Sequence, residues 1–179
     1  MQTIRRAAEN DIPAVAAIYD RVLIREERGE TSIGWKRGIY PTADTAREAL
    51  AAGELFVMER GGAIVAAARI NQTQVPEYAA AAWTITDVTP DEVMVLHTLV
   101  VDPLCAGAGL GTAFVRFYEQ HAAVAGCRAL RMDTNVRNAA ARRLYGHLGY
   151  REVGVVPCVF NGIEGVSLVC LEKAVTPQE

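Results

Sequence analysis

The segment from Gly107 to Thr112, with the sequence Gly-Ala-Gly-Leu-Gly-Thr, combines residue types that could bind an anion. Apolar and largely β-branched residues at 93–101 precede it and predict a buried strand, which Pro103 ends because proline cannot donate to a ladder. After the glycines, the apolar residues recur at helical spacing, at Leu110, Ala113, Phe114, Phe117, His121 and Val124. The segment therefore predicts a strand, a glycine-rich turn and a helix.

This turn has the features of a phosphate site. Its alternate glycines allow a sharp bend in which several backbone N–H groups face one point. The helix that follows adds the positive end of its dipole, which favours phosphate oxygens. The same residues would also form a tight turn that binds no ligand, so the turn alone does not establish a function.

Two common phosphate-binding turns do not fit the sequence. A P-loop requires a lysine after its last glycine, whereas Gly111 is followed directly by Thr112. A dinucleotide turn has the pattern G-x-G-x-x-G, and here the third glycine comes one residue early, with no βαβ unit starting at the N-terminus. A nucleotide-binding protein that uses the turn in another way stays an alternative.

A second polar segment begins about 30 residues later, on the next strand–helix unit. Asn138 can cap a short helix on which Ala141, Leu144 and Tyr145 share one face, and Gly149 can end it. The residues at 128–134 before it predict another strand. Two successive strand–helix units are thus predicted in this part of the chain.

Together these segments resemble the two signature motifs of the GNAT superfamily of acyl-CoA-dependent N-acyltransferases. The first motif, V-x-P-x-x-[R/Q]-G-x-G-[I/L]-G, is matched at Val101, Pro103, Gly107, Gly109, Leu110 and Gly111. The second, N-x-x-A-x-x-L-Y-x-x-x-G-[F/Y], is matched at Asn138, Ala141, Leu144, Tyr145, Gly149 and Tyr150. Ala106 stands where the family usually has Arg or Gln, and Ala108 lacks the basic side chain often found at its position.

The resemblance implies acetyl-CoA as a co-substrate and no metal. The glycine turn would receive the pyrophosphate, the backbone of Leu99 and Val101 the acetyl carbonyl and the pantetheine amide, and Asn138 the pantetheine arm. Arg142 or Arg143 could supply charge for the 3′-phosphate, or form a solvated basic face. The implied coenzyme-binding set is Leu99, Val100, Val101, Ala106, Gly107, Ala108, Gly109, Leu110, Gly111, Thr112, Asn138 and Arg143.

The implied reaction is direct attack of a primary amine on the thioester. Tyr145 matches the tyrosine that often protonates the departing thiolate in the family. Glu92 and His97, before and within the strand at 93–101, are the two candidate bases. Trp35, Tyr40 and Trp83 lie in irregular segments expected beside the acceptor cleft, where they line it or fill the core. A module that binds acyl-CoA without efficient catalysis is the alternative that the uncharged Ala106 favours.

The elements that must position these residues form one α/β domain spanning 1–179. Strands are predicted at 2–8, 54–59, 63–71, 93–101, 128–134, 150–156 and 166–171, and helices at about 11–28, 42–52, 110–124 and 138–148. Hairpin turns are expected at Gly61-Gly62 and Asn161-Gly162. The expected fold is thus the GNAT fold, with a mixed central sheet of about seven strands and four helices, and a tail frayed from about residue 174.

Composition narrows the class of protein. The 179 residues are 51% hydrophobic and 22% charged, with a net charge of −3, as in an ordinary globular domain. We find no basic stripe for nucleic acid, no membrane-length apolar run and no signal peptide, so we expect a cytoplasmic protein. The four cysteines show no C-x-x-C spacing and are expected to be reduced thiols. The expected partner is a small-molecule or peptide amine, and a homodimer stays open because dimers are common in the family.

Overall fold

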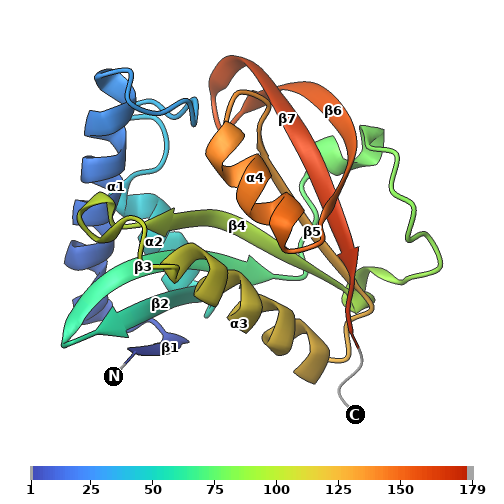
Figure 1. Cartoon of the computed structure of the whole chain (residues 1–179), viewed down its shortest axis with the longest axis horizontal. Helices are drawn as coiled ribbons and strands as arrows, with labels where there is room; N and C mark the ends of the chain where they lie inside the picture. The colour runs from blue at the N-terminus through green and yellow to red at the C-terminus, as the bar shows by residue number, and fades with distance from the viewer. Residues whose placement is uncertain (1, 177–179) are drawn as a thin grey trace.

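A mixed seven-stranded β-sheet runs through the computed structural model, which describes residues 2–176 (Figure 1). The strands lie in the order β1-β2-β3-β4-β5-β7-β6. Their bounds are β1 Gln2–Arg6, β2 Leu55–Arg60, β3 Ala63–Asn71, β4 Val93–Val101, β5 Ala129–Asn135, β6 Arg151–Phe160 and β7 Ile163–Ala174. Only β4 and β5 pair in parallel, and the other neighbours are antiparallel. The predicted fold class is confirmed.

Four helices cover the two faces of this sheet. The first pair, α1 (Ile12–Glu27) and α2 (Ala43–Ala51), packs on one face, while α3 (Leu110–Val124) and α4 (Ala139–His147) pack on the face nearer the viewer in Figure 1. The predicted caps are present: Thr42 accepts from the N–H of Thr45, and the Asn138 side chain accepts from that of Ala141. These caps place the helix starts where the sequence predicted them.

A buried tyrosine joins the two parallel strands. Tyr118 of α3 is fully buried, and its hydroxyl donates to the carbonyl oxygens of Met94 at 2.6 Å and Arg131 at 3.2 Å. Its ring packs in the same core as Phe114, which is also fully buried. The contacts hold β4 and β5 together at their first residues, so any separation must occur further along.

The two parallel strands do separate further along. Their pairing runs from Val93 with Ala129 to Leu96 with Met132 and then stops. Thr98 follows with a φ of +52°, and the register between β3 and β4 shifts beside it. A positive φ is strained for a β-branched residue, so the surrounding structure must hold this bulge. The sequence had predicted an unbroken strand here, because an apolar run carries no local signal for a bulge.

Other differences from the sequence prediction are smaller. The strands β6 and β7 are longer than predicted and reach the turn at Asn161-Gly162 from both sides. Val124 of α3, expected in the buried stripe of that helix, is 78% exposed. The fraying expected from residue 174 is wrong for the first residues of the tail, because Ala174 ends β7 and the Val175 N–H donates to the Arg128 oxygen at 2.9 Å. Residues 177–179 lie outside the described residues.

Two further observations complete the fold. The long connection between β3 and β4 contains short 3₁₀ turns at Pro76–Ala80 and Pro90–Glu92, and it buries Tyr78. No helix in residues 2–176 combines the length and the apolar character needed to cross a membrane.

Candidate functional site

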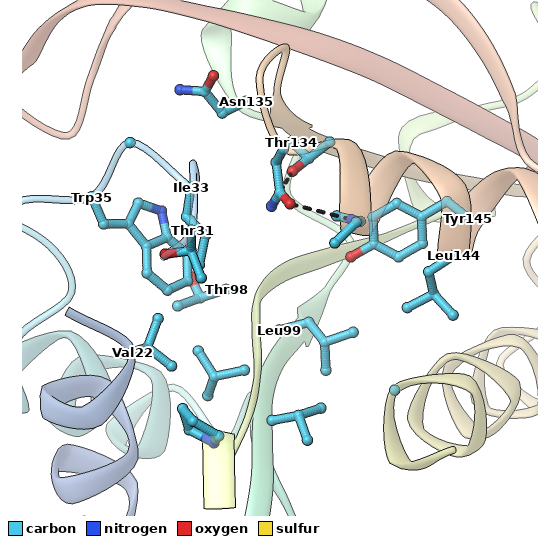
Figure 2. A pocket seen from close by; sticks show the side chains of 18 of the residues that line it. Val22, Thr31, Ile33, Trp35, Thr98, Leu99, Thr134, Asn135, Leu144 and Tyr145 are labelled. Atoms are coloured by element: carbon cyan, nitrogen blue, oxygen red, sulfur yellow. Dashed lines mark hydrogen bonds between the residues drawn. The ribbon is translucent and has the colours of Figure 1, made fainter. Parts of the chain in front are cut away.

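The separation of β4 and β5 opens a cavity of about 470 Å³, here called the central pocket (Figure 2). It is lined by the ends of both strands, the glycine turn, the start of α4 and the connection between α1 and α2, which contributes Thr31, Ile33 and Trp35. Its volume lies within the range of small-molecule and cofactor sites. The pocket can therefore receive a substantial ligand between the strands.

The backbone of β4 turns hydrogen-bonding groups toward this pocket. The Asp102 N–H donates to the Val65 oxygen at 2.8 Å, on the β3 side. Backbone groups alternate in direction along an extended strand, so the amides of Val101 and Leu99 face the opposite side. On that side β5 no longer pairs with β4, which leaves these amides for a ligand, as the predicted carbonyl and pantetheine contacts require.

The three glycines of the turn have different roles. Gly107 and Gly109 adopt φ values of +80° and +72°, which favour glycine, and the N–H groups at 107–109 donate no hydrogen bond within residues 2–176. The first N–H groups of α3 also lack intrahelical partners. By contrast, a Cβ at Gly111 would lie 3.2 Å from the Leu144 Cδ2 atom, so this glycine allows α3 to approach α4 closely.

Most of the predicted coenzyme-binding residues line the central pocket. These are Leu99, Val100, Val101, Ala106, Gly107, Gly109, Leu110, Gly111, Thr112 and Asn138. Ala108 is exposed on the turn but does not line the pocket, and Arg143 is exposed on α4 outside it. Arg142 is held by Glu152 at 2.7 and 2.9 Å, so it offers no free charge. The pocket instead includes Arg25 of α1, which sequence analysis missed because α1 has the pattern of an ordinary amphipathic helix.

An ion pair fixes the glycine turn to α1. Asp102 is only 6% exposed and accepts from the Arg21 side chain at 2.9 and 2.7 Å. The same carboxylate accepts from the Leu104 N–H at 3.0 Å, at the start of the turn. Sequence analysis did not pair these two residues, which are 81 positions apart.

Tyr145 and Asn138 lie where the second motif predicts. The Tyr145 side chain is buried on α4, and its hydroxyl oxygen points into the space between α4 and β4 (Figure 2). Burial raises the pKa of this phenol far above its usual value, so the hydroxyl stays protonated. The Asn138 amide accepts from Ala141 and donates to the Thr134 hydroxyl at 3.1 Å, which leaves one N–H for a ligand.

Of the two predicted bases, Glu92 does not reach the site. Its carboxylate accepts from the Thr89 N–H at 2.9 Å and the Thr89 hydroxyl at 3.2 Å, in the turn before β4. Leu99 lies seven residues further along the strand, which corresponds to about 20 Å. Glu92 lines neither of the two cavities described in this section, so the prediction that it relays a proton is corrected.

His97 lines a second cavity, of about 540 Å³, on the face covered by α1 and α2. We call this cavity the α2 pocket, since Thr42, Thr45 and Glu48 of the second helix and its cap form one wall. His97 Nε2 lies 2.8 Å from the Asn71 side-chain oxygen. Burial, helped by the charge of Arg69, lowers the pKa of His97 to about 4, so the imidazole is neutral at pH 7.

The two cavities meet where β4 and β5 diverge. The residues lining both are Tyr40, Leu96, Thr98, Asp133 and Phe160. Of the predicted acceptor-lining aromatics, Trp35 lines the central pocket and Tyr40 lines both, with its hydroxyl bonded to that of Thr98. Trp83 lines neither: its indole donates to the Tyr78 oxygen at 2.7 Å and its ring stacks under Arg131, so it fills the core.

Asp133 is the residue that sequence analysis missed at this junction. It is the one carboxylate among the residues that line both cavities, and it accepts from the Tyr78 hydroxyl at 2.8 Å. Burial raises the pKa of Asp133 to about 6, against the hydrogen bond from Tyr78, which lowers it. An aspartate within a predicted strand was the available signal, but only the divergence of the strands shows what it faces.

Comparison with known proteins agrees with this fold. Residues 21–150 match the model of the acetyltransferase (GNAT) family, and the chain belongs to this family. Over 77 residues it is 31% identical to the uncharacterized N-acetyltransferase MJ1530 of Methanocaldococcus jannaschii, an alignment covering 42% of this chain and 49% of that protein. The chain thus matches about half the length of this relative.

Solved structures share the fold over nearly the whole chain. A GNAT-family acetyltransferase from Streptococcus agalactiae has a TM-score of 0.79 at 22% identity, covering 97% of this chain and 95% of that one. The structure of yncA from Salmonella typhimurium with its cofactor acetyl-CoA has a TM-score of 0.70 at 19% identity, with 100% and 96% coverage. The ribosomal-protein-S18-alanine N-acetyltransferase of Escherichia coli has a TM-score of 0.67 at 19% identity, with 100% and 97% coverage.

Proposed function

We propose that this protein is an N-acetyltransferase that transfers the acetyl group of acetyl-CoA to a primary amine. The observation that carries the proposal is the junction of the two cavities at the divergence of β4 and β5. One cavity has unpaired backbone donors and a phenol, and the other would bring a second molecule to the carboxylate that both share, Asp133. Family membership and the acetyl-CoA-bound neighbour support this assignment.

The chemical groups that line the central pocket suit the successive parts of the coenzyme. The unpaired N–H groups of the turn and the start of α3 suit a pyrophosphate, and the amides of Leu99 and Val101 suit the thioester end. The remaining Asn138 N–H suits the pantetheine arm, and the exposed Arg143 stays the predicted partner of the 3′-phosphate. When bound, acetyl-CoA would supply an acetyl group already activated as a thioester.

The acceptor must lose a proton before it can attack. A primary ammonium has a pKa near 10, so at neutral pH almost every acceptor arrives protonated. Asp133 is the proposed proton acceptor, because its raised pKa leaves it charged at pH 7 yet more basic than an ordinary aspartate. His97 is the second candidate, as a neutral imidazole on the acceptor side, and would act through water.

The sulfur of the departing coenzyme must also receive a proton. The amine nitrogen forms a bond to the carbonyl carbon, the carbon–sulfur bond breaks, and the Tyr145 hydroxyl donates its proton to the departing thiolate. The nitrogen loses a second proton as it becomes an amide, and this proton restores the Tyr145 hydroxyl, while Asp133 releases the first proton to solvent. Burial raises the pKa of the phenol, and the same burial disfavours a thiolate and raises the pKa of the thiol, so the two shifts offset each other in the transfer. The products are an N-acetylated amine and the free coenzyme thiol, with one proton released.

The test is thiol release from acetyl-CoA in the presence of pooled primary amines, with a parallel thermal-shift measurement. We expect amine-dependent release together with a melting temperature raised by acetyl-CoA. Stabilisation without release in any pool would favour the second candidate, an acyl-CoA-binding module, to which the uncharged Ala106 points. Equal stabilisation by ATP or NAD would instead favour a nucleotide-binding protein.

A further inference from the structure

The α2 pocket contains a cation that acetyl transfer itself does not require. Arg69 of β3 lines this cavity beside His97, and its side chain is 36% exposed. Its Nε donates to Glu54 at 2.6 Å. Its two terminal amino groups donate no hydrogen bond within residues 2–176. One edge of the guanidinium is therefore engaged and the other is available.

A network of side chains fixes the orientation of this guanidinium. The Glu54 oxygen that holds Arg69 also accepts from the Asn71 amide at 3.0 Å. The Asn71 side-chain oxygen lies 2.8 Å from His97 Nε2, so these contacts connect Glu54 on one side to His97 of β4 on the other. A guanidinium held by one edge presents its two terminal amino groups as a fork that matches a carboxylate.

The second charged group that lines the inner part of the α2 pocket, the carboxylate of Asp133, is negative. Burial is the main cause that raises the pKa of Tyr40 to about 12. The negative charge of Asp133 raises this pKa further, whereas the positive charge of Arg69 lowers it. The two charges thus lie near one hydroxyl group. Asp133 belongs to both cavities and Arg69 to the α2 pocket alone, so Arg69 is the more distant from the thioester end.

We propose that the acceptor is a small amine that also carries a carboxylate, of the amino-acid type, with its ammonium at Asp133 and its carboxylate on Arg69. This inference rests on the proposed function and names the substrate class of the same site. The rings of the buried Tyr19 and the partly buried Phe160 would contact the rest of the acceptor. The exposed acids Asp44 and Glu48 at the rim would favour a polyamine instead, although Asp44 is already paired with Arg47 at 2.7 Å.

The test compares acceptors that differ only in the carboxylate. The full chain at saturating acetyl-CoA is assayed for thiol release with a panel of L-amino acids, the matching amino-acid amides, the decarboxylated amines, and spermidine. For the best acceptor we expect kcat/KM to be at least about tenfold higher for the free amino acid than for its amide or decarboxylated form, because the charged hydrogen bonds are lost.

Variants then assign this preference to Arg69. Arg69→Gln should raise the KM for amino acids about 10- to 100-fold, leave the slow reaction with the amides unchanged, and leave the acetyl-CoA thermal shift unchanged. Arg69→Lys keeps the charge and should recover part of the loss. Arg128→Gln, which removes an exposed arginine that lines neither cavity, is the matched control and should match the unchanged protein.

The outcomes separate the two proposals. Faster release with spermidine or with the decarboxylated amines than with any amino acid would overturn the carboxylate proposal while leaving acetyl transfer intact. Equal losses for amino acids and amides in Arg69→Gln would also overturn it, since the residue would then act on the fold. Absence of thiol release with every amine would overturn the proposed function itself.

Discussion

The two cavities of this protein are built in different ways. In the central pocket, the proposed coenzyme contacts are mainly backbone groups and small residues from the glycine turn, the end of β4 and the start of α4, although segments from α1 to β7 also line this cavity. The α2 pocket depends on side chains from elements as far apart as α1 and the turn between β6 and β7. The proposed coenzyme contacts thus come from local segments, whereas the proposed recognition of the acceptor is distributed along the chain.

This difference explains how the first motif can vary. Backbone N–H groups donate whatever side chain they carry, so Ala106 and Ala108 can replace basic residues without removing the donors of the turn. In the α2 pocket each side chain supplies a specific contact, and a single substitution should change the acceptor. Changes in the two cavities should therefore have separable effects on turnover, on coenzyme binding and on acceptor choice.

The largest effect is expected at Tyr145, on the central-pocket side of the junction. Tyr145→Phe removes only the hydroxyl and should reduce kcat by about 10²- to 10⁴-fold, with little change in folding or acetyl-CoA affinity. Tyr150→Phe is the matched control, because its ring lies 6.0 Å from that of Tyr145 and its buried hydroxyl has no partner within residues 2–176. Near-native turnover of Tyr145→Phe would show that this tyrosine lines the pocket without donating a proton.

The next effect is expected at the residue that both cavities share. Asp133→Asn preserves an oxygen for the Tyr78 hydroxyl but cannot take up a proton, so kcat should fall about 10²-fold. Glu92→Gln, at the other end of β4, is the control and should have native turnover. A loss of turnover in Glu92→Gln but not in Asp133→Asn would instead support Glu92 as the base, as the sequence predicted.

The same carboxylate predicts a pH dependence. Because the pKa of Asp133 is raised to about 6, activity should rise with pH through about 6 as the proton acceptor becomes charged. A raised acid pKa also means that the folded state holds the proton more tightly than the unfolded one, so this group's contribution to stability falls as pH rises from about 4 to about 6. Asp133→Asn should remove both effects, and a profile unchanged in that variant would assign the titration to another group.

A smaller effect, on coenzyme binding, is expected in the glycine turn. Gly109→Val and Gly126→Val place the same side chain at φ values of +72° and +79°, each with no atom within 4 Å of the new Cβ. Both should lose about 1–2 kcal/mol of stability through the left-handed backbone. Only Gly109→Val should weaken acetyl-CoA about 10- to 100-fold in a thermal-shift titration, because it crowds the phosphate donors. Equal coenzyme binding by the two variants would place the pyrophosphate elsewhere.

The smallest effect concerns the position where the turn departs from the family pattern. Ala106 is exposed beside the pocket, so Ala106→Arg should tighten acetyl-CoA binding only about two- to fivefold at low salt. The gain should vanish at high salt, since exposed charges are screened. A gain that persists at high salt would show that the backbone donors alone bind the phosphates poorly.

The sequence by itself determined the parts of the molecule that follow local rules. The glycine turn, the caps at Thr42 and Asn138 and the hairpin turn at Asn161-Gly162 all form where residue type and spacing predict them. Such features depend on a few neighbouring residues, whose backbone preferences and hydrogen bonds are nearly the same in any fold. The order of strands and helices followed from them, and with it the fold class.

Only the tertiary structure decided which polar residues meet. It separated β4 from β5 beyond Leu96, excluded Glu92 and Trp83 from the cavities, and brought Asp133 to Tyr78 across 55 positions of sequence. The physical reason is that a side chain's pKa and reach depend on burial and on partners supplied by distant segments, which no local pattern records. Asp133 is an ordinary strand residue in the sequence, and it becomes a candidate base because the fold places it where the two cavities meet and desolvation raises its pKa.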